Sequence, residues 1–550
     1  MSFAVVVWDV TRGGFYFTVF GVRISSWETY KPLRNGLLCT VAALCLNGRT
    51  AADHTAAWRR LGRRAPWIAA AVAVASTVLA VYCGIDAAGG ADAYGYVTQA
   101  GLWASHRLVV REPFLKLVSQ LGPAVAPLGY YVGQEPGTMV PTYAPGLPIA
   151  MAVASTIGGA RAVYLVVPVL GGLAVWLTFV LGRRVADPIA GLVAATLLAF
   201  SPIFVFQSLE PMSDVPATAW WLLAWVLALA DGVWPALGAG LAVSAAVLTR
   251  PNLVPLAAIL IVVVARQRPR LPRAAAFAIG VVPSCVAIAA LNWFWYGSPL
   301  QSGYGALGSL FAWQNVGENV RHYVGWLVAL HSPAILVALA APFVARARYA
   351  WTMIAFSALV LALYLPYFVY ESWTFLRFLL PALPLLFVLG GAIVVAIVER
   401  LPVRLRAAAI VLVVMLVPYF FLTKADGLSV FAIQAAEHRY AAVGELVDRA
   451  LPANAAIITL TESGSIRLYG HRPTVRWDLV ERPALGVTLR HLHSSGYAPY
   501  VLLEEWEHAP FRARFDGTNG FDRIEWTPAF SYYGLTAVHI YPVTGAVRQE

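Results

Sequence analysis

The chain has 550 residues, of which 59% are hydrophobic and only 12% are charged. A soluble protein of this length does not need so much apolar surface, so the composition excludes a soluble enzyme and predicts a polytopic membrane protein. The net charge of +11 suggests a nucleic-acid partner at first sight. The arginines, however, cluster in short loops between apolar runs, which is an orientation signal of membrane proteins, so no nucleic acid is expected.

The first segment, residues 1–64, is predicted to lie at the membrane surface. Residues 14–24 contain glycines and aromatics that favour an amphipathic hairpin or helix. A weak apolar run, Leu37–Leu46, is a candidate additional membrane span, and the side on which the first residues lie depends on whether it crosses.

The second segment, residues 65–423, is predicted to hold the membrane helices. Apolar runs of nearly spanning length or more recur through it, which gives about 11–12 helices with the candidate near the N-terminus. The runs lie near 65–84, 161–182, 188–204, 216–230, 233–249, 252–265, 272–291, 333–346, 349–370, 378–398 and 406–423.

Arginine clusters fall on alternate loops between these runs. They are Arg59/Arg60/Arg63/Arg64, Arg183/Arg184, Arg266/Arg268/Arg270/Arg273, Arg346/Arg348 and Arg400/Arg404/Arg406. All of them can be cytoplasmic at once, as the positive-inside rule requires. The outward-facing parts are then residues 85–160, 205–215, 292–332, 371–377 and 424–550.

Two of the outward parts are long enough to hold structure of their own. Within the first outer loop, the apolar run Ala144–Ile157 is too short to span, and a crossing there would place Arg183 outside, so we expect a helix lying in the membrane interface. After Thr423 the charged residues increase, and short β-like runs alternate with helix-like stretches. Residues 424–550 therefore predict a small extracytoplasmic α/β domain.

Asp92 is the most informative residue of the first outer loop. It follows two glycines and precedes Tyr94 and Tyr96, close to the outer end of the first strongly apolar helix. It fits two roles: a helix cap, or a general base that deprotonates or orients an acceptor hydroxyl. A carboxylate that is partly desolvated near lipid has a raised pKa, which suits the second role. Asp86 is a competitor that lacks the flanking tyrosines.

The short outer loop around residues 208–216 carries two acids, Glu210 and Asp214. If the turn is helical, their i, i+4 spacing places them on one face. The alternative is again capping, with Asp214 as the N-cap and Pro216 in the first turn of the next helix. The two acids could also bind a divalent cation, but no His or Cys joins them at ligand spacing, so no metal-binding residue is assigned.

Aromatic and polar residues mark three further places on the outer face. Tyr143 lies in a rigid proline- and glycine-rich turn before the expected interfacial helix. Tyr304, Arg321 and His322 belong to a glycine-, serine- and aromatic-rich loop that suits a sugar or headgroup site, but suits an interfacial aromatic belt equally. Arg377, at the outer end of a membrane helix, either snorkels to the interface or holds a lipid phosphate.

These fragments together resemble the GT-C type of glycosyltransferase, with a pattern similar to the protein O-mannosyltransferase and lipid A aminoarabinose transferase group. The matching fragments are Asp92–Tyr96, Tyr143–Gly146, Pro211–Pro216 and Arg377–Pro381. The architectural likeness covers roughly residues 65–425, whereas the first 60 residues match nothing in the pattern.

The resemblance implies a sugar donor linked to polyprenyl phosphate and an acceptor that is a glycan, a lipid or a protein. It places Asp92 at the catalytic acidic position of the first loop, Asp214 at the acid of the second outer loop, and Arg377 near the carrier phosphate. Glu210 is a second acid where the family often has one. The implied reaction is a single displacement with inversion at the anomeric carbon, aided by Arg377 and by Arg321 or a divalent cation.

Two other classes of function compete with this reading. A lipid or glycolipid transporter would carry ionisable groups in mid-membrane or repeated halves with broken helices, and neither is evident. A non-catalytic protein that binds lipid-linked sugar would retain its role without Asp92. The alanine- and arginine-rich composition favours a bacterium, with the protein in the inner membrane and residues 424–550 in the periplasm.

Overall fold

The computed structural model describes residues 50–305, 310–345 and 347–544, together with 15–19, 22–26, 35–36, 39 and 42–43. Near the N-terminus, β1 (Phe15–Val19) and β2 (Val22–Ser26) pair antiparallel, so this part of the chain forms the hairpin that was one of the two expected alternatives. Most of the candidate span Leu37–Leu46 lies outside the described residues.

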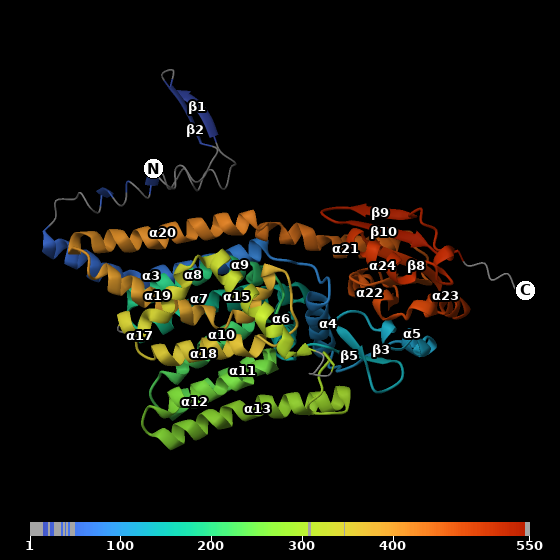
Figure 1. The fold of residues 1–550 in the computed structure, drawn as a ribbon, viewed down its shortest axis with the longest axis horizontal. Helices are drawn as coiled ribbons and strands as arrows, with labels where there is room; N and C mark the ends of the chain where they lie inside the picture. Colours follow the sequence, from blue (N-terminus) through green and yellow to red (C-terminus); the bar gives the residue numbers. More distant parts are fainter. Residues whose placement is uncertain are drawn as a thin grey trace, which may run out of the picture.

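A large helical bundle forms the body of the protein (Figure 1). Its α-helices are α3 (Ala51–Cys83), α7 (Val166–Val185), α8 (Pro188–Phe200), α9 (Pro202–Leu209), α10 (Asp214–Ala228), α11 (Val233–Thr249), α12 (Ala257–Ala265), α13 (Arg270–Tyr296), α15 (Val316–His331), α16 (Ala334–Val337), α17 (Ala341–Val344), α18 (Ala350–Tyr364), α19 (Leu383–Val398) and α20 (Val403–Gly427). Short 3-10 helices precede four of them: η2 (Ala160–Leu165), η3 (Pro251–Leu256), η4 (Trp313–Asn315) and η6 (Trp373–Leu379); another, η5 (Ala338–Ala340), lies between α16 and α17.

Glycine pairs allow the central helices to approach closely. A Cβ built on Gly182 of α7 would lie 2.6 Å from Cα of Gly191 on α8, and one on Gly240 of α11 would lie 2.9 Å from Cα of Gly280 on α13. Small residues at such crossings are typical of membrane helices, where packing, and not apolar burial, drives association.

The helices confirm the predicted polytopic α-helical class. By length and composition, four of the described helices are apolar and long enough to cross a membrane, and seven are if each sharply bent pair counts as one span. One such pair is α8 and α9, which bend by 58° at the position where the sequence predicts a single span over 188–204. The total of 11–12 spans stays a prediction.

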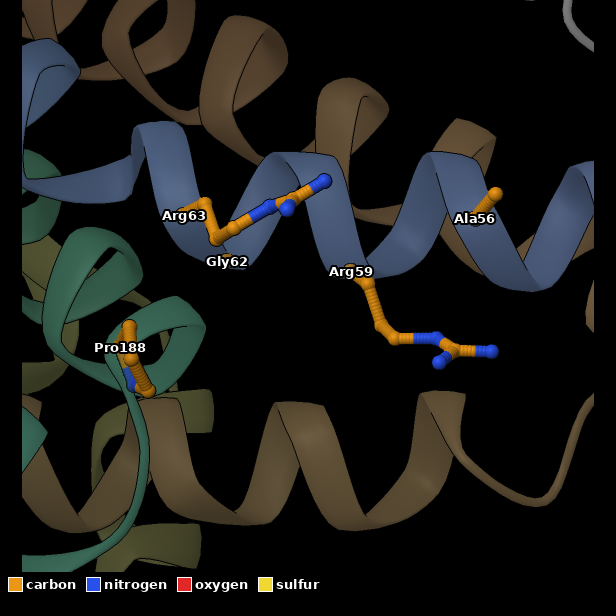
Figure 2. Close-up of a pocket in the computed structure, with 5 residues that line it drawn as sticks. All are labelled: Ala56, Arg59, Gly62, Arg63 and Pro188. Carbon is orange, nitrogen blue, oxygen red and sulfur yellow. The ribbon is translucent and has the colours of Figure 1, made fainter.

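The first long helix begins earlier than predicted, at Ala51 and not at residue 65. A capping box explains the difference: the Thr50 hydroxyl accepts from the backbone N–H of Asp53, and the Asp53 carboxylate accepts from that of Thr50 at 3.0 Å. This local motif starts the helix well before its apolar part. A cavity of about 540 Å³ lies near this end, lined by Arg59 and Arg63 of α3 and by Pro188 of α8 (Figure 2).

The first outer loop folds into α4 (Asp92–Ala104), α5 (Pro113–Leu117), a 3-10 helix η1 (Ser119–Val125), α6 (Gly146–Gly158) and a small antiparallel sheet. The sheet has the order β3 (Val110–Arg111), β5 (Thr138–Pro141) and β4 (Tyr130–Val132). The helix expected over Ala144–Ile157 is present as α6; its position in the membrane interface stays a prediction.

The C-terminal residues form the predicted small α/β domain at one end of the bundle (Figure 1). Its five-stranded sheet has the order β7 (Thr474–Arg476), β6 (Ala455–Thr459), β8 (Ala498–Glu504), β10 (Ala537–Pro542) and β9 (Phe530–Tyr533). β6 is parallel to β7 and β8, and β10 is antiparallel to its neighbours. The α-helices are α21 (Ile433–Ala450), α22 (Ser463–Tyr469), α23 (Leu485–Ser494) and α24 (His508–Phe515), and short 3-10 turns link the elements.

Candidate active site

Asp92 begins α4 and contacts a cation from the distant part of the chain. Its Oδ2 lies 3.3 Å from Nη2 of Arg377, and 31% of the Asp92 side chain is exposed. The N-cap of α4 is Ala91, and no side chain caps the helix. The capping alternative for Asp92 is therefore wrong: its carboxylate caps no helix N–H group and contacts Arg377 instead.

Arg377 points into the protein. It lies on η6, its side chain is 16% exposed, and its Nη1 donates to Sδ of Met212 at 3.1 Å. The guanidinium carbon also lies 5.0 Å from the ring centre of Phe375. Nε is buried and has no hydrogen-bond partner among the described residues. These contacts do not fit a side chain that snorkels to the interface.

Asp214 forms a second, more deeply buried ion pair. Its Oδ1 lies 3.0 Å from Nη2 of Arg250; the Asp214 side chain is fully buried and that of Arg250 is 14% exposed. Arg250 also donates to the hydroxyls of Ser213, at 3.3 Å, and Tyr364, at 3.1 Å. Because the N-cap of α10 is Ser213, the prediction that Asp214 caps this helix is wrong by one residue.

Glu210 does not share a helical face with Asp214, because the turn between α9 and α10 is extended at Glu210. The carboxylate of Glu210 accepts from Nε2 of Gln207 at 2.9 Å. Burial raises the pKa of Glu210 to about 8, against the opposing influence of Arg377. The group is thus largely protonated at neutral pH. Both Glu210 and Asp92 are half-buried.

Tyrosines line the same region. The Tyr96 hydroxyl donates to Oγ of Ser213 at 2.9 Å, and the Tyr96 ring lies 4.7 Å, centre to centre, from that of Tyr143. Tyr304 meets Tyr143 edge to face at 5.9 Å. Three of the four predicted tyrosines are therefore brought together, whereas Tyr94 projects from the opposite face of α4.

Two other predicted residues lie elsewhere. Arg321 is exposed on α15 and pairs with Glu318 at 2.6 Å. His322, on the same helix, stacks on Trp326 with ring centres 4.9 Å apart. The structure does not bring either side chain into contact with Asp92 or Arg377.

The backbone that leads into Asp92 is held by the C-terminal domain. The amide of Ala88 donates to the Tyr469 hydroxyl at 2.8 Å, and Gln434 donates to the Gly84 carbonyl at 2.7 Å. Gly89 lies so close to the ring of Tyr440 that an added Cβ would overlap it. The domain therefore fixes the start of α4, and with it the position of the Asp92 carboxylate.

The arrangement of helices and domain was compared with solved structures. ArnT from Cupriavidus metallidurans, bound to undecaprenyl phosphate, aligns with a TM-score of 0.51 at 11% identity over 86% of this chain and 96% of that one. The apo oligosaccharyltransferase of Archaeoglobus fulgidus aligns with a TM-score of 0.51 at 13% identity over 87% of this chain and 74% of that one. The chain has the GT-C fold. The fold suggested by the sequence fragments is thus confirmed.

Sequence comparison adds one local match. The family model for the N-terminal part of the oligosaccharyl transferase STT3 matches residues 126–230. This stretch of the GT-C fold holds Tyr143, Glu210 and Asp214. No curated protein matches the chain.

The sequence reasoning missed Arg250, which follows α11 and forms the buried ion pair with Asp214 in the candidate site. A signal was present: by the alternation of the apolar runs 233–249 and 252–265, Arg250 falls on an outer turn, against the positive-inside rule. A buried arginine needs a partner, and Asp214 is that partner. In the part of the chain that the structure describes, no three His, Cys, Asp or Glu side chains gather as metal ligands.

The Arg250–Asp214 pair predicts an asymmetric effect on stability. Arg250→Met leaves the buried Asp214 carboxylate without a partner, which we expect to lower the free energy of unfolding by about 3–5 kcal/mol. The double variant Arg250→Met with Asp214→Leu removes both charges. We expect it to lower the free energy of unfolding less than Arg250→Met alone does. Apparent unfolding temperatures in detergent measure this difference; a double variant no more stable than the single variant would contradict it.

Proposed function

We propose that the protein is an integral membrane glycosyltransferase that moves a hexosyl or pentosyl unit from a polyprenyl-phosphate carrier to an acceptor hydroxyl. The observation that carries the proposal is the contact between Asp92 and Arg377 at the start of α4, within a GT-C fold. An accessible carboxylate beside a buried guanidinium supplies a base and an anion-binding group at one point. The undecaprenyl phosphate bound to ArnT supports the choice of carrier.

In the proposed reaction, the Asp92 carboxylate takes the proton of the acceptor hydroxyl. The acceptor oxygen forms a bond to the anomeric carbon while the bond from that carbon to the phosphate oxygen breaks. The polyprenyl phosphate leaves with the bonding electrons, and attack from the opposite side inverts the anomeric centre. No covalent intermediate on the protein is needed.

Arg377 stabilises the leaving phosphate in this proposal. Its charge is favourable there because developing negative charge in a water-poor site gains most from a preorganised cation. Arg250 remains paired with Asp214 and orients the site through Ser213 and Tyr364. A divalent cation that arrives with the donor would add to the positive charge.

We place the reaction on the periplasmic face of a bacterial inner membrane. The Arg59/Arg63 end of α3 and the Gly84 end, which leads to Asp92, are separated by most of a 33-residue helix. At 1.5 Å of rise per residue, such a helix is about 50 Å long, enough to cross a bilayer. With the arginine-rich end in the cytoplasm, Asp92 and the C-terminal domain lie outside.

The donor class is tested with membranes that contain the protein, supplied with radiolabelled polyprenyl-phosphate mannose, glucose, arabinose or aminoarabinose, or with the matching nucleotide sugars. We expect labelled sugar to be released from a polyprenyl-phosphate donor and from none of the nucleotide sugars. Translocation of the intact labelled lipid without cleavage would favour a transporter. Tight binding of the labelled lipid, with neither cleavage nor translocation, would favour a non-catalytic protein that binds lipid-linked sugar.

Glu210 predicts a pH dependence of donor binding. Its pKa of about 8 means that the carboxyl group ionises as the pH rises through 8. The new negative charge lowers the positive potential at Arg377, so we expect the apparent KM for the anionic donor to increase above pH 8. In Glu210→Gln this increase should be absent. Identical KM–pH curves for the two proteins would show that Glu210 does not titrate in this range.

A further inference from the structure

A second cavity, of about 460 Å³, lies behind α4. It is formed where α4 meets the sheet of the first outer loop, the helices α6 and η2, and α22 of the C-terminal domain. Its volume is within the range of about 300–1,000 Å³ that is typical of sites for small molecules. The cavity therefore has room for a ligand of that size.

α4 presents different faces to the cavity and to the candidate active site. Tyr94, Thr98 and Gly101 line the cavity and are spaced i, i+4, i+7, so they share one face of the helix. Asp92 and Tyr96, also spaced i, i+4, lie on the opposite face because they are offset by two residues from Tyr94 and Thr98. One helix thus separates the acid from the second cavity.

The polar groups of the cavity wall are held in fixed positions. The guanidinium of Arg467 pairs with the Glu112 carboxylate and also donates to the Val125 carbonyl at 2.8 Å. The Tyr130 hydroxyl donates to Oγ1 of Thr98 at 3.0 Å. Nε and Nη2 of Arg467 also donate to Thr474, so the wall presents the Glu112 carboxylate as an acceptor beside an arginine that its own hydrogen bonds hold in place.

The lining holds two arginines and one carboxylate: Arg467 pairs with Glu112, and Arg107 is exposed. The paired, inner part of the wall favours a neutral ligand. A phosphate close to Arg467 would also meet the Glu112 carboxylate, which pairs with the same guanidinium, so it would gain little. A sugar ring has hydroxyls that both donate and accept, which suits a guanidinium beside a carboxylate. The rings of Tyr94 and Tyr130, with centres 5.8 Å apart, offer faces for the C–H groups of the sugar.

We propose that this cavity binds a neutral sugar unit of an oligosaccharide acceptor. The inference rests on the proposed function and names the acceptor class that the function leaves open. Because an α-helix with its side chains is about 10–12 Å across, only an acceptor of several units would occupy the cavity and also present a hydroxyl to Asp92. A monosaccharide would occupy either the cavity or the site beside Asp92, but not both.

Gly101 provides a clean way to close the cavity. It lies within α4 and lines the cavity, and a Cβ added to it meets nothing within 4 Å. We therefore expect Gly101→Phe to be accommodated without movement of the backbone and to set its ring against the cavity, whereas Gly101→Ala leaves the cavity open. Both changes favour the helix, since glycine is the poorer helix former.

The test uses the purified full chain in nanodiscs and short neutral oligosaccharides of mannose, glucose, galactose and arabinose, each compared with its monosaccharide by saturation-transfer NMR. We expect wild type and Gly101→Ala to bind at least one oligosaccharide, and Gly101→Phe to bind it about tenfold or more weakly. Hydrolysis of polyprenyl-phosphate sugar in water should be the same in all three proteins. Equal apparent unfolding temperatures would show that the substituted proteins are folded.

Other results would overturn the proposal. If no oligosaccharide binds, or if Gly101→Phe binds as well as wild type, the cavity is not a sugar site. If inorganic phosphate binds there and Glu112→Gln strengthens its binding, the cavity is an anion site instead. If sugar binding depends on Gly101 but no polyprenyl-phosphate sugar is cleaved, the sugar site stands and the proposed transferase function fails.

Discussion

Asp92→Asn is expected to lower kcat for sugar transfer by about 10²–10⁴-fold, because an amide cannot take the proton of the acceptor hydroxyl. The substitution keeps the size of the side chain. It also keeps an oxygen that can accept from Arg377, which lies 3.3 Å from the carboxylate. Donor binding and folding should therefore change little. Steady-state kinetics with a polyprenyl-phosphate sugar measure the effect.

Asp86→Asn is the matched control. Asp86 lies in the same loop, is exposed, and differs from Asp92 in having no arginine within ion-pairing distance in the described structure. We expect Asp86→Asn to transfer sugar at the wild-type rate. Near-normal turnover by Asp92→Asn, or an equal loss in both variants, would remove Asp92 from the catalytic role.

Arg377→Gln is expected to raise the apparent KM for the polyprenyl-phosphate donor by about 10- to 100-fold. A hydrogen bond to a charged group contributes about 1.5–3 kcal/mol, which corresponds to a change of this size. kcat should fall as well, because the leaving phosphate carries more charge in the transition state than in the bound donor. The KM and kcat for the donor are measured separately.

Arg321→Gln is the corresponding control, with the same change of side chain. Arg321 was also predicted to bind the lipid phosphate, but it is exposed on α15 and pairs with Glu318. We expect the donor KM of Arg321→Gln to equal that of wild type. A KM that depends on Arg321 and not on Arg377 would move the phosphate site to the loop around residues 302–323.

The fold was predictable from sequence where the signal is local. Long apolar runs indicated the helices, and short β-like runs such as Ala456–Leu460 and Tyr500–Leu503 indicated strands that are present as β6 and β8. Errors arose where a short motif overrides hydropathy. The capping box at Thr50 starts α3 early, and the bend between α8 and α9 ends a helix that the composition would continue.

The candidate site was predictable only one residue at a time. Asp92, Asp214 and Arg377 stood out because ionisable groups near the ends of membrane helices are costly unless they are used. Their pairing could not be predicted, since Asp92 and Arg377 are 285 residues apart and meet only in the folded chain. For the same reason, no local sequence pattern indicated that Arg250 pairs with Asp214 or that Tyr440 packs against Gly89.

The proposed reaction is tested most directly by identifying which bond of the donor is cleaved. Purified protein is incubated with a polyprenyl-phosphate sugar in water labelled with oxygen-18, and both products are analysed by mass spectrometry. Attack at the anomeric carbon predicts the heavy oxygen in the released sugar, unlabelled polyprenyl phosphate, and a rate about 10²–10⁴-fold lower with Asp92→Asn. Heavy oxygen in the phosphate would show cleavage of the phosphorus–oxygen bond and would contradict glycosyl transfer by this site.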